Sequence, residues 1–340
     1  MVPDQVPPAA VTVAQRSTRR HVLMAVAGLA SGGVFLWLAL GSVDGAGLRR
    51  QAHLLDLSLL VGATALYWLA LSLRVLRWQL LLRQLGAAPL ALVAETLVVG
   101  YAVNNVLPAR LGEVARAAYA KRRLGIGRAR VFGSIVIERL LDLLAILSCL
   151  GGGLLLFAGG GQGPRIPTFE LIAINAGVVI GIAVLALVVL RSGGLDRIPL
   201  PAPVLAVSRD FRVGIAALNR QSATLAVVLS AAIWLFEVCA LVQIFHALQL
   251  SLTLAQGLLL MGAASLSTLV PTAPGYLGTY QLVFVLAMRV FGLPESAGVV
   301  ASTAIQLCLF GSVTVAGGVL LGWRALRRWR ASLVAAVAVD

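Results

Sequence analysis

Hydrophobic residues form long unbroken stretches along this chain, and short arginine-rich segments separate many of them. Several stretches are long enough for an α-helix to cross a hydrocarbon core of about 30 Å. They do not show the alternating pattern of strands in an outer-membrane barrel. The pattern predicts an all-α polytopic membrane protein. The stretches lie near residues 22–40, 54–73, 90–107, 131–158, 170–190, 223–249, 254–270, 279–291 and 295–322.

The basic residues predict which stretches cross the membrane completely. If every stretch crossed, the flanking Arg74, Arg77 and Arg83 would face the side opposite to the basic segment 110–130. That split contradicts the tendency of basic loops to stay in the cytoplasm. The conflict disappears if 90–107 enters from the cytoplasm and turns back near its end. The same reasoning predicts that the later stretches include a second hairpin, which enters from the outer side.

The resulting topology has six full spans plus two re-entrant helical hairpins, and it forms an inverted repeat with both termini in the cytoplasm. The breaks in the two halves align, because Val106-Leu107-Pro108 corresponds to Leu269-Val270-Pro271. Matching interrupted helices in inverted repeats indicate a transport site near the midplane. A chance match in a glycine-rich chain is the alternative. The predicted regions are a tail, two membrane half-repeats and a second tail: 1–21, 22–158, 159–322 and 323–340.

Composition agrees with this class and limits the function. Hydrophobic residues make up 60% of the chain and charged residues 12%, whereas soluble proteins carry about 25% charge. The net charge of +14 lies in short loops that orient helices, so we expect membrane lipids and no nucleic acid as partners. The three cysteines lie in apolar stretches and predict neither a disulfide nor a metal site. No cofactor is expected.

The two breaks are the first candidates for a functional site. Backbone leaves a helix at membrane depth only where it is buried in protein or lines a polar cavity. Helices that restart near Glu113 and Thr279 would direct free N–H groups at that cavity, which suits a phosphate. Arg110 and Arg116 add positive charge beside the first break. The alternative is that Glu113 only neutralises an arginine cluster at the interface.

A second charged group lies within an apolar stretch and consists of Glu138, Arg139 and Asp142. An ionised group inside a span costs about 2.5–3.5 kcal/mol on insertion scales, so these side chains should face the protein interior or a polar cavity. One interpretation is that they form a pathway for a substrate or for protons. The other is that they form a structural ion pair that locks this span to the first hairpin. Glu237 is isolated in its stretch, so it needs a partner elsewhere or stays protonated.

The motifs Asn104–Glu113, Glu138–Asp142 and Pro271–Gly278 together resemble the family named for the transmembrane region of lysylphosphatidylglycerol synthase. The resemblance covers about residues 22–322 and implies a cell-membrane protein that moves or handles lipids. Larger relatives carry a synthase domain; this chain resembles a stand-alone form, so aminoacyl transfer is not expected. The sequence departs from the family pattern at Gln281, where an acidic residue is expected, and at Gln306, where an arginine is frequent.

We therefore expect a flippase-like protein that translocates or handles an anionic lipid of the phospholipid or polyprenyl-phosphate type. A non-transporting membrane partner subunit of a separate lipid-modifying enzyme or glycosyltransferase is the alternative. The expected protein partners are such an enzyme and a second copy of this chain in a homo-oligomer. A lipid-modifying enzyme is less favoured, because no protease, hydrolase or P-loop motif is present. The predicted headgroup-binding residues are Asn104, Asn105, Pro108, Arg110, Gly112, Glu113, Arg116, Glu138, Arg139, Asp142, Pro271, Pro274, Gly275, Gly278 and Gln281.

Overall fold

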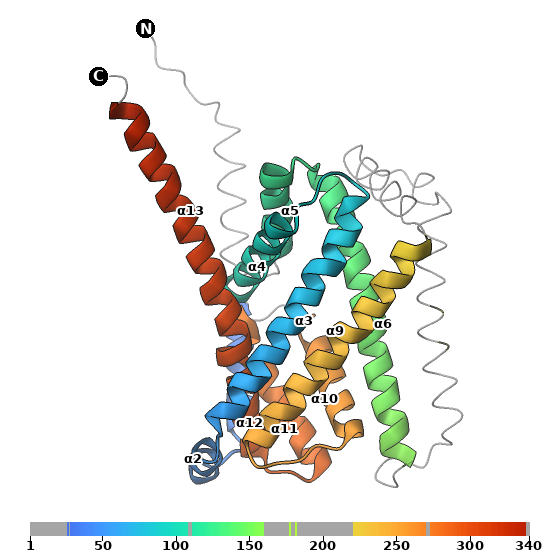
Figure 1. The fold of residues 1–340 in the computed structure, drawn as a ribbon. Helices are drawn as coiled ribbons and strands as arrows, with labels where there is room; N and C mark the ends of the chain where they lie inside the picture. The colour runs from blue at the N-terminus through green and yellow to red at the C-terminus, as the bar shows by residue number, and fades with distance from the viewer. Residues whose placement is uncertain are drawn as a thin grey trace, which may run out of the picture.

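The apolar stretches fold into helices that pack side by side, as the computed structural model shows (Figure 1). It describes residues 26, 28–107, 111–159, 177, 181, 220–269 and 273–337, and this part of the chain contains no β-strand. The elements are helix Gly28–Leu40, α2 (Gly45–His53), α3 (Leu57–Arg83), α4 (Leu90–Val106), α5 (Leu111–Leu124), α6 (Arg128–Gly159), α9 (Arg220–Ala247), α10 (Leu254–Ser267), η2 (Pro274–Tyr276), α11 (Thr279–Phe291), α12 (Glu295–Ala304), η3 (Ile305–Phe310) and α13 (Gly311–Val337).

Local sequence signals set the ends of several helices. Asp56 caps α3 by accepting a hydrogen bond of 2.8 Å from the backbone N–H of Ser58. Thr253 and Gln256 form a reciprocal capping box at the start of α10, which satisfies two N–H groups that a helix leaves open. α11 ends at Phe291 and is capped by Gly292, whose left-handed backbone (φ 69°) suits glycine.

Four of the predicted spans are helices long and apolar enough to cross a membrane: α3, α6, α9 and the continuous run from α12 through η3 into α13. Helix Gly28–Leu40 is bent by 90° from α2, and these two helices meet the same criterion only as a pair. The predicted span at 170–190 lies outside the described residues, apart from Gly177 and Gly181. The described structure therefore agrees with a polytopic helical protein of at least four spans.

α3 is longer than the hydrophobic pattern predicted. The prediction ended the span at residue 73 and left the next arginines outside it, but α3 continues to Arg83. Arg74 and Arg77 are 8% and 0% exposed, so their placement in a loop was wrong. An arginine within a membrane span faces the interior of the helix bundle, where carboxylates on other helices neutralise it. Those carboxylates are distant from Arg74 and Arg77 in sequence.

The two segments predicted as re-entrant hairpins form pairs of contacting helices, α4 with α5 and α10 with α11, which lie toward opposite ends of the molecule in Figure 1. Their entry into the membrane from opposite sides stays a prediction. Within the first pair the backbones cross closely, because a Cβ on Gly112 would lie 2.2 Å from the Gly100 carbonyl oxygen. Each pair packs on the last long helix of the other half: α6 contacts α10, and α13 contacts α4. α3 and α9 pack along one another.

The two breaks meet inside the molecule. The short helix η2 of the second break packs on α4, and a Cβ on Gly275 would lie 3.6 Å from the carbonyl oxygen of Asn105. Gly278 has a left-handed backbone (φ 85°), and a Cβ there would lie 2.0 Å from the carbonyl oxygen of Gly32. Helix Gly28–Leu40 therefore supports the second break through a direct backbone contact.

Candidate functional site

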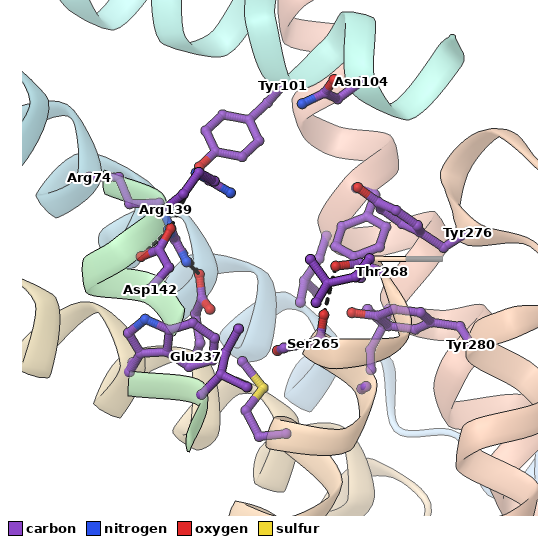
Figure 2. A pocket seen from close by; sticks show the side chains of 18 of the residues that line it. Arg74, Tyr101, Asn104, Arg139, Asp142, Glu237, Ser265, Thr268, Tyr276 and Tyr280 are labelled. Carbon is purple, nitrogen blue, oxygen red and sulfur yellow. Dashed lines mark hydrogen bonds and ion pairs between the residues drawn. The ribbon is translucent and has the colours of Figure 1, made fainter. Parts of the chain in front are cut away.

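A cavity of about 390 Å³ lies where the breaks meet. Asn104, Asn105 and Glu113 line it from the first hairpin, and Tyr276 lines it from the second break. Figure 2 shows charged side chains from α3, α6 and α9 on one side and tyrosine and hydroxyl side chains on the other. The cavity thus has two chemically different walls.

The charged wall is a network of ion pairs that join three helices (Figure 2). Arg74 on α3 lies 2.6 Å from Glu237 on α9 and 3.3 Å from Asp142 on α6. Asp142 also pairs with Arg139 at 3.2 Å and with Arg77 at 2.9 Å. Glu237, which has no local partner in the sequence, is therefore neutralised by an arginine 163 residues away.

A second layer of charge lies behind this wall and does not line the cavity. The side chains of Arg77 and Glu138 are fully buried and lie 3.7 Å apart, and Arg77 also donates to Ser230 at 2.7 Å. Arg116 on α5 pairs with Glu138 at 2.5 Å and lies 3.5 Å from the centre of the Trp78 ring. These contacts connect α3, α5, α6 and α9, so this layer has the geometry of a scaffold.

Among the described residues, the charges in the two layers balance, with four arginines facing four carboxylates. Of the ion pairs between described residues of these layers, only Glu113–Arg139 has both a long N–O distance, 3.8 Å, and partly exposed side chains, at 21% and 35%. A partly exposed ion pair with a long N–O distance contributes little stability. The described members are Arg74, Arg77, Arg116, Arg139, Glu113, Glu138, Asp142 and Glu237.

Asparagine side chains organise the first break. Asn104 accepts a hydrogen bond of 2.7 Å from the backbone N–H of Gly112, so it caps the start of α5. Asn105 donates to the Phe310 carbonyl and to Thr314, each at 3.0 Å, which ties the break to η3 and α13. The sequence predicted free N–H groups at this terminus, but the one at Gly112 is already paired within the protein.

Glutamine side chains organise the second break in a similar way. The backbone N–H of Gly278 donates to Gln281 at 2.8 Å, and Gln281 donates to Gln306 at 2.6 Å. Gln306, which lies in the π-helical segment η3, donates onward to the Gly275 carbonyl at 2.9 Å. The two positions that depart from the expected charged pattern thus form one neutral hydrogen-bonded pair.

The predicted site residues fall into four settings in the structure. Those lining the cavity are Asn104, Asn105, Glu113, Arg139 and Asp142; those behind it are Arg116 and Glu138; those that shape the breaks are Gly112, Pro274, Gly275, Gly278 and Gln281; and Pro108, Arg110 and Pro271 lie outside the described residues.

Comparison with known proteins assigns the chain to a family. Residues 24–317 match the family model described as "Lysylphosphatidylglycerol synthase TM region". The chain belongs to this family. It is therefore an integral membrane protein.

Two curated relatives are similar to this member of the lysylphosphatidylglycerol synthase TM region family. Glycosyltransferase AglD of Haloferax volcanii is 26% identical over 346 residues, which cover 91% of this chain and 55% of AglD. The UPF0104 membrane protein MJ1078 of Methanocaldococcus jannaschii is 27% identical over 222 residues, which cover 64% of this chain and 92% of MJ1078. The chain thus spans about half the length of AglD.

Sequence reasoning missed the aromatic lining and one arginine of the site in this family member. Tyr101, Trp234, Tyr276 and Tyr280 all line the cavity, although aromatic residues make up only 6% of the chain. Tyr276 and Tyr280 are four residues apart, but no spacing in the sequence links them to Tyr101 or Trp234. One feature of the sequence could have indicated Arg74: the isolated Glu237 required a cationic partner on a neighbouring helix.

Proposed function

We propose that this protein is flippase-like and receives the phosphate headgroup of an anionic lipid in the cavity between the two breaks. The observation that carries the proposal is the Glu113–Arg139 pair, the loose charged pair that opens onto the cavity. Charged groups within membrane proteins mark substrate pathways when they face a cavity. The aminoacyl-transfer reaction of larger family members is not part of this proposal.

Arg139 suits a phosphate because its guanidinium presents paired donors to two oxygens at once. Asp142 holds Arg139 from one side at 3.2 Å, so the guanidinium stays in place when Glu113 is displaced. Glu113 then becomes available to accept a hydrogen bond from another part of the headgroup. The positive and negative charges of the network behind the pair balance. The cavity therefore does not bind an anion so tightly that it cannot be released, as translocation requires.

We propose further that the two halves, 22–158 and 159–322, form an inverted repeat. The reciprocal packing of α6 on α10 and of α13 on α4 supports this relation. The Glu113–Arg139 ion pair of the first half corresponds to the hydrogen-bonded pair Gln281–Gln306 of the second half. Gln281 lies 168 residues after Glu113, and Gln306 lies 167 residues after Arg139. Rocking of one half against the other would expose the cavity to the two leaflets in turn.

We propose that the protein lies in the cell membrane with both termini in the cytoplasm. The ends of α3 and α13 and the starts of α6 and α9 lie at the same end of the molecule (Figure 1). These segments include Arg83, Arg128, Arg220 and Arg324. Basic residues gathered at one end support a cytoplasmic assignment for that end.

Leaflet exchange in liposomes tests the proposal. Purified protein is reconstituted with fluorescent phosphatidylglycerol or a fluorescent short-chain polyprenyl phosphate, and exchange is followed by quenching of the outer leaflet. We expect protein-dependent exchange that Arg139→Gln slows at least about tenfold, the effect of losing about 1.4 kcal/mol. Arg289→Gln is the matched control, because Arg289 forms an exposed ion pair with Glu295 at 2.7 Å away from the cavity lining. Equal rates for wild type and Arg139→Gln would contradict the proposal.

A second candidate is a membrane partner that supports a separate glycosyltransferase or lipid-modifying enzyme without moving lipid. The partial coverage of AglD favours it, since 45% of that glycosyltransferase lies outside the match to this chain (100% minus 55%). Co-purification of such an enzyme with this protein, together with no leaflet exchange in liposomes, would favour this candidate over the first.

A further inference from the structure

The wall opposite the charged network has its own chemistry. Tyr276, Tyr280, Ser265 and Thr268 lie on this side of the cavity (Figure 2). The rings of Tyr276 and Tyr280 are stacked with centroids 6.1 Å apart, and Phe310 meets both edge-on. An aromatic surface therefore lies beside hydroxyl groups. Binding of an apolar acyl chain alone would not require the hydroxyl groups.

Tyr276 is held in an unusual backbone conformation. Its φ is 60°, in the left-handed region, directly after Gly275 with φ 65°. A residue other than glycine in this region costs of the order of 1–3 kcal/mol, and such residues cluster at functional sites. The conformation brings a half-buried ring to the cavity rather than packing it wholly in the core.

Two buried donors at the cavity have no hydrogen-bond partner among the described residues. Trp234 is only 6% exposed, and its indole N–H is unpaired. The Tyr101 hydroxyl is also buried and unpaired, and its ring points from α4 toward the charged wall (Figure 2). An unmet buried donor costs about 1–3 kcal/mol. The indole N–H can only donate, so it calls for a ligand with oxygen acceptors and not for an ammonium group.

We propose that the aromatic wall is a platform for a sugar ring, and that the ligand is a glycosylated lipid phosphate. The C–H face of a sugar ring packs on an aromatic face, whose electron density is negative. Its hydroxyls can exchange hydrogen bonds with Ser265 and Thr268 beside the platform. They can also accept across the cavity from Trp234, whose ring lies 6.0 Å from the Arg74 guanidinium, while Arg139 on the charged wall takes the phosphate. This inference rests on the proposed function of the cavity and adds a second recognised group.

Calorimetric titration of the purified protein tests this inference with three probes. They are a short-chain polyprenyl phosphate hexose, the same polyprenyl phosphate without sugar, and free hexose 1-phosphate. We expect the glycosylated lipid to bind about tenfold more tightly than the bare lipid phosphate, a difference of about 1.4 kcal/mol. Free hexose 1-phosphate should bind more weakly than either lipid, because it lacks the tail.

Variants of Tyr276 separate the sugar preference from folding. Tyr276→Gly removes the ring at a position where glycine adopts the backbone without strain, so it should bind both lipids equally. Tyr276→Phe keeps the ring and should keep most of the preference. Trp234→Phe removes the unpaired donor and should weaken only the glycosylated probe. Arg139→Gln should weaken both lipids to a similar extent.

The outcomes distinguish this inference from the proposed function. Equal affinity of the wild type for the two lipid probes, or a preference that survives in Tyr276→Gly, would overturn the sugar platform and leave phosphate binding intact. Failure of both lipid phosphates to bind would overturn the proposed function itself. Free hexose 1-phosphate that binds as tightly as the glycosylated lipid would overturn the lipid part of the inference.

Discussion

Arg77 and Arg139 both pair with Asp142, but they lie at different depths. The Arg77 side chain is fully buried against Glu138 and Asp142, whereas Arg139 is 35% exposed at the cavity. Removing one partner from a buried ion pair costs about 3–5 kcal/mol, because it leaves an uncompensated charge. We therefore expect Arg77→Met to lower the free energy of unfolding by about that amount and Arg139→Met to lower it much less.

Thermal unfolding in detergent, followed by tryptophan fluorescence, measures this difference. Arg139→Met should unfold within a few degrees of the wild type and lose lipid-phosphate binding, so it reports on the site. Arg77→Met should unfold at a clearly lower temperature. Equal unfolding temperatures for the two variants would show that the two layers of charge do not have separate roles.

The sequence predicted which residues carry charge but not how they pair. Glu138, Arg139 and Asp142 were identified as one cluster from their helical spacing. Their arginine partners on α3 were assigned to a loop, because a hydrophobic window ends a span at the first charge. Tertiary neutralisation by carboxylates on other helices overrides that rule, and a single sequence contains no direct signal of it.

Gly278 and Gly292 provide a matched pair for the structure of the second hairpin. Both have left-handed backbones, with φ 85° and 69°, so alanine is strained at either position. At Gly278 the new Cβ would also lie 2.0 Å from the Gly32 carbonyl oxygen, whereas at Gly292 it would meet nothing within 4 Å. We expect Gly278→Ala to destabilise the protein beyond the ~1–3 kcal/mol of backbone strain seen in Gly292→Ala.

The unfolding temperatures of the two alanine variants compare these effects directly. The difference between them isolates the contact of helix Gly28–Leu40 with the second break. If Gly278→Ala were no worse than Gly292→Ala, that contact would not support the break.

Glu95 connects the first hairpin to α13. It accepts hydrogen bonds from Tyr119 and Arg324 and lies 3.8 Å from Arg123. We expect Glu95→Gln to loosen the end of α13 from α4, because the amide keeps only neutral hydrogen bonds. Hydrogen exchange measured by mass spectrometry should show at least about threefold faster exchange in the C-terminal half of α13. Glu295→Gln, which affects an exposed pair, should leave α13 unchanged; equal exchange in wild type and Glu95→Gln would contradict the connection.

At the scale of elements, hydrophobic length and helix breakers predicted four of the long helices and the interruption between the two helices of each shorter pair. The aligned breaks before Pro108 and Pro271 were the strongest signals, since proline cannot continue a helix without losing a hydrogen bond. The π-helical segment Ile305–Phe310 was not predicted. It lies where Gln306 reaches the Gly275 carbonyl, and that contact depends on packing between distant segments.

For the whole molecule, the central expectation is that the two hairpins enter from opposite sides of the membrane. Single cysteines in place of Lys121 and Leu254, both exposed, test this in a background without Cys149, Cys239 and Cys308. We expect a membrane-impermeant maleimide to label Leu254→Cys in intact cells and Lys121→Cys only after the cytoplasmic side is opened. Labelling of both from the same side would contradict the inverted arrangement.

The distribution of arginines sufficed to predict which helix ends share one end of the molecule, because loop charge reports orientation. It could not predict the cavity, which forms only when α3, α6, α9 and both breaks come together. The inverted repeat and the span at 170–190 remain predictions. The chemistry of the two walls also became visible only in three dimensions.

We propose above that the cavity between the breaks holds a lipid phosphate. Electron cryomicroscopy of the protein in lipid nanodiscs containing polyprenyl phosphate tests it most directly. We predict headgroup density in the cavity within hydrogen-bonding distance of the Arg139 guanidinium, and loss of that density in Arg139→Gln. Ordered lipid found only on the outer surface, with Arg139 still paired to Glu113 beside an empty cavity, would contradict it.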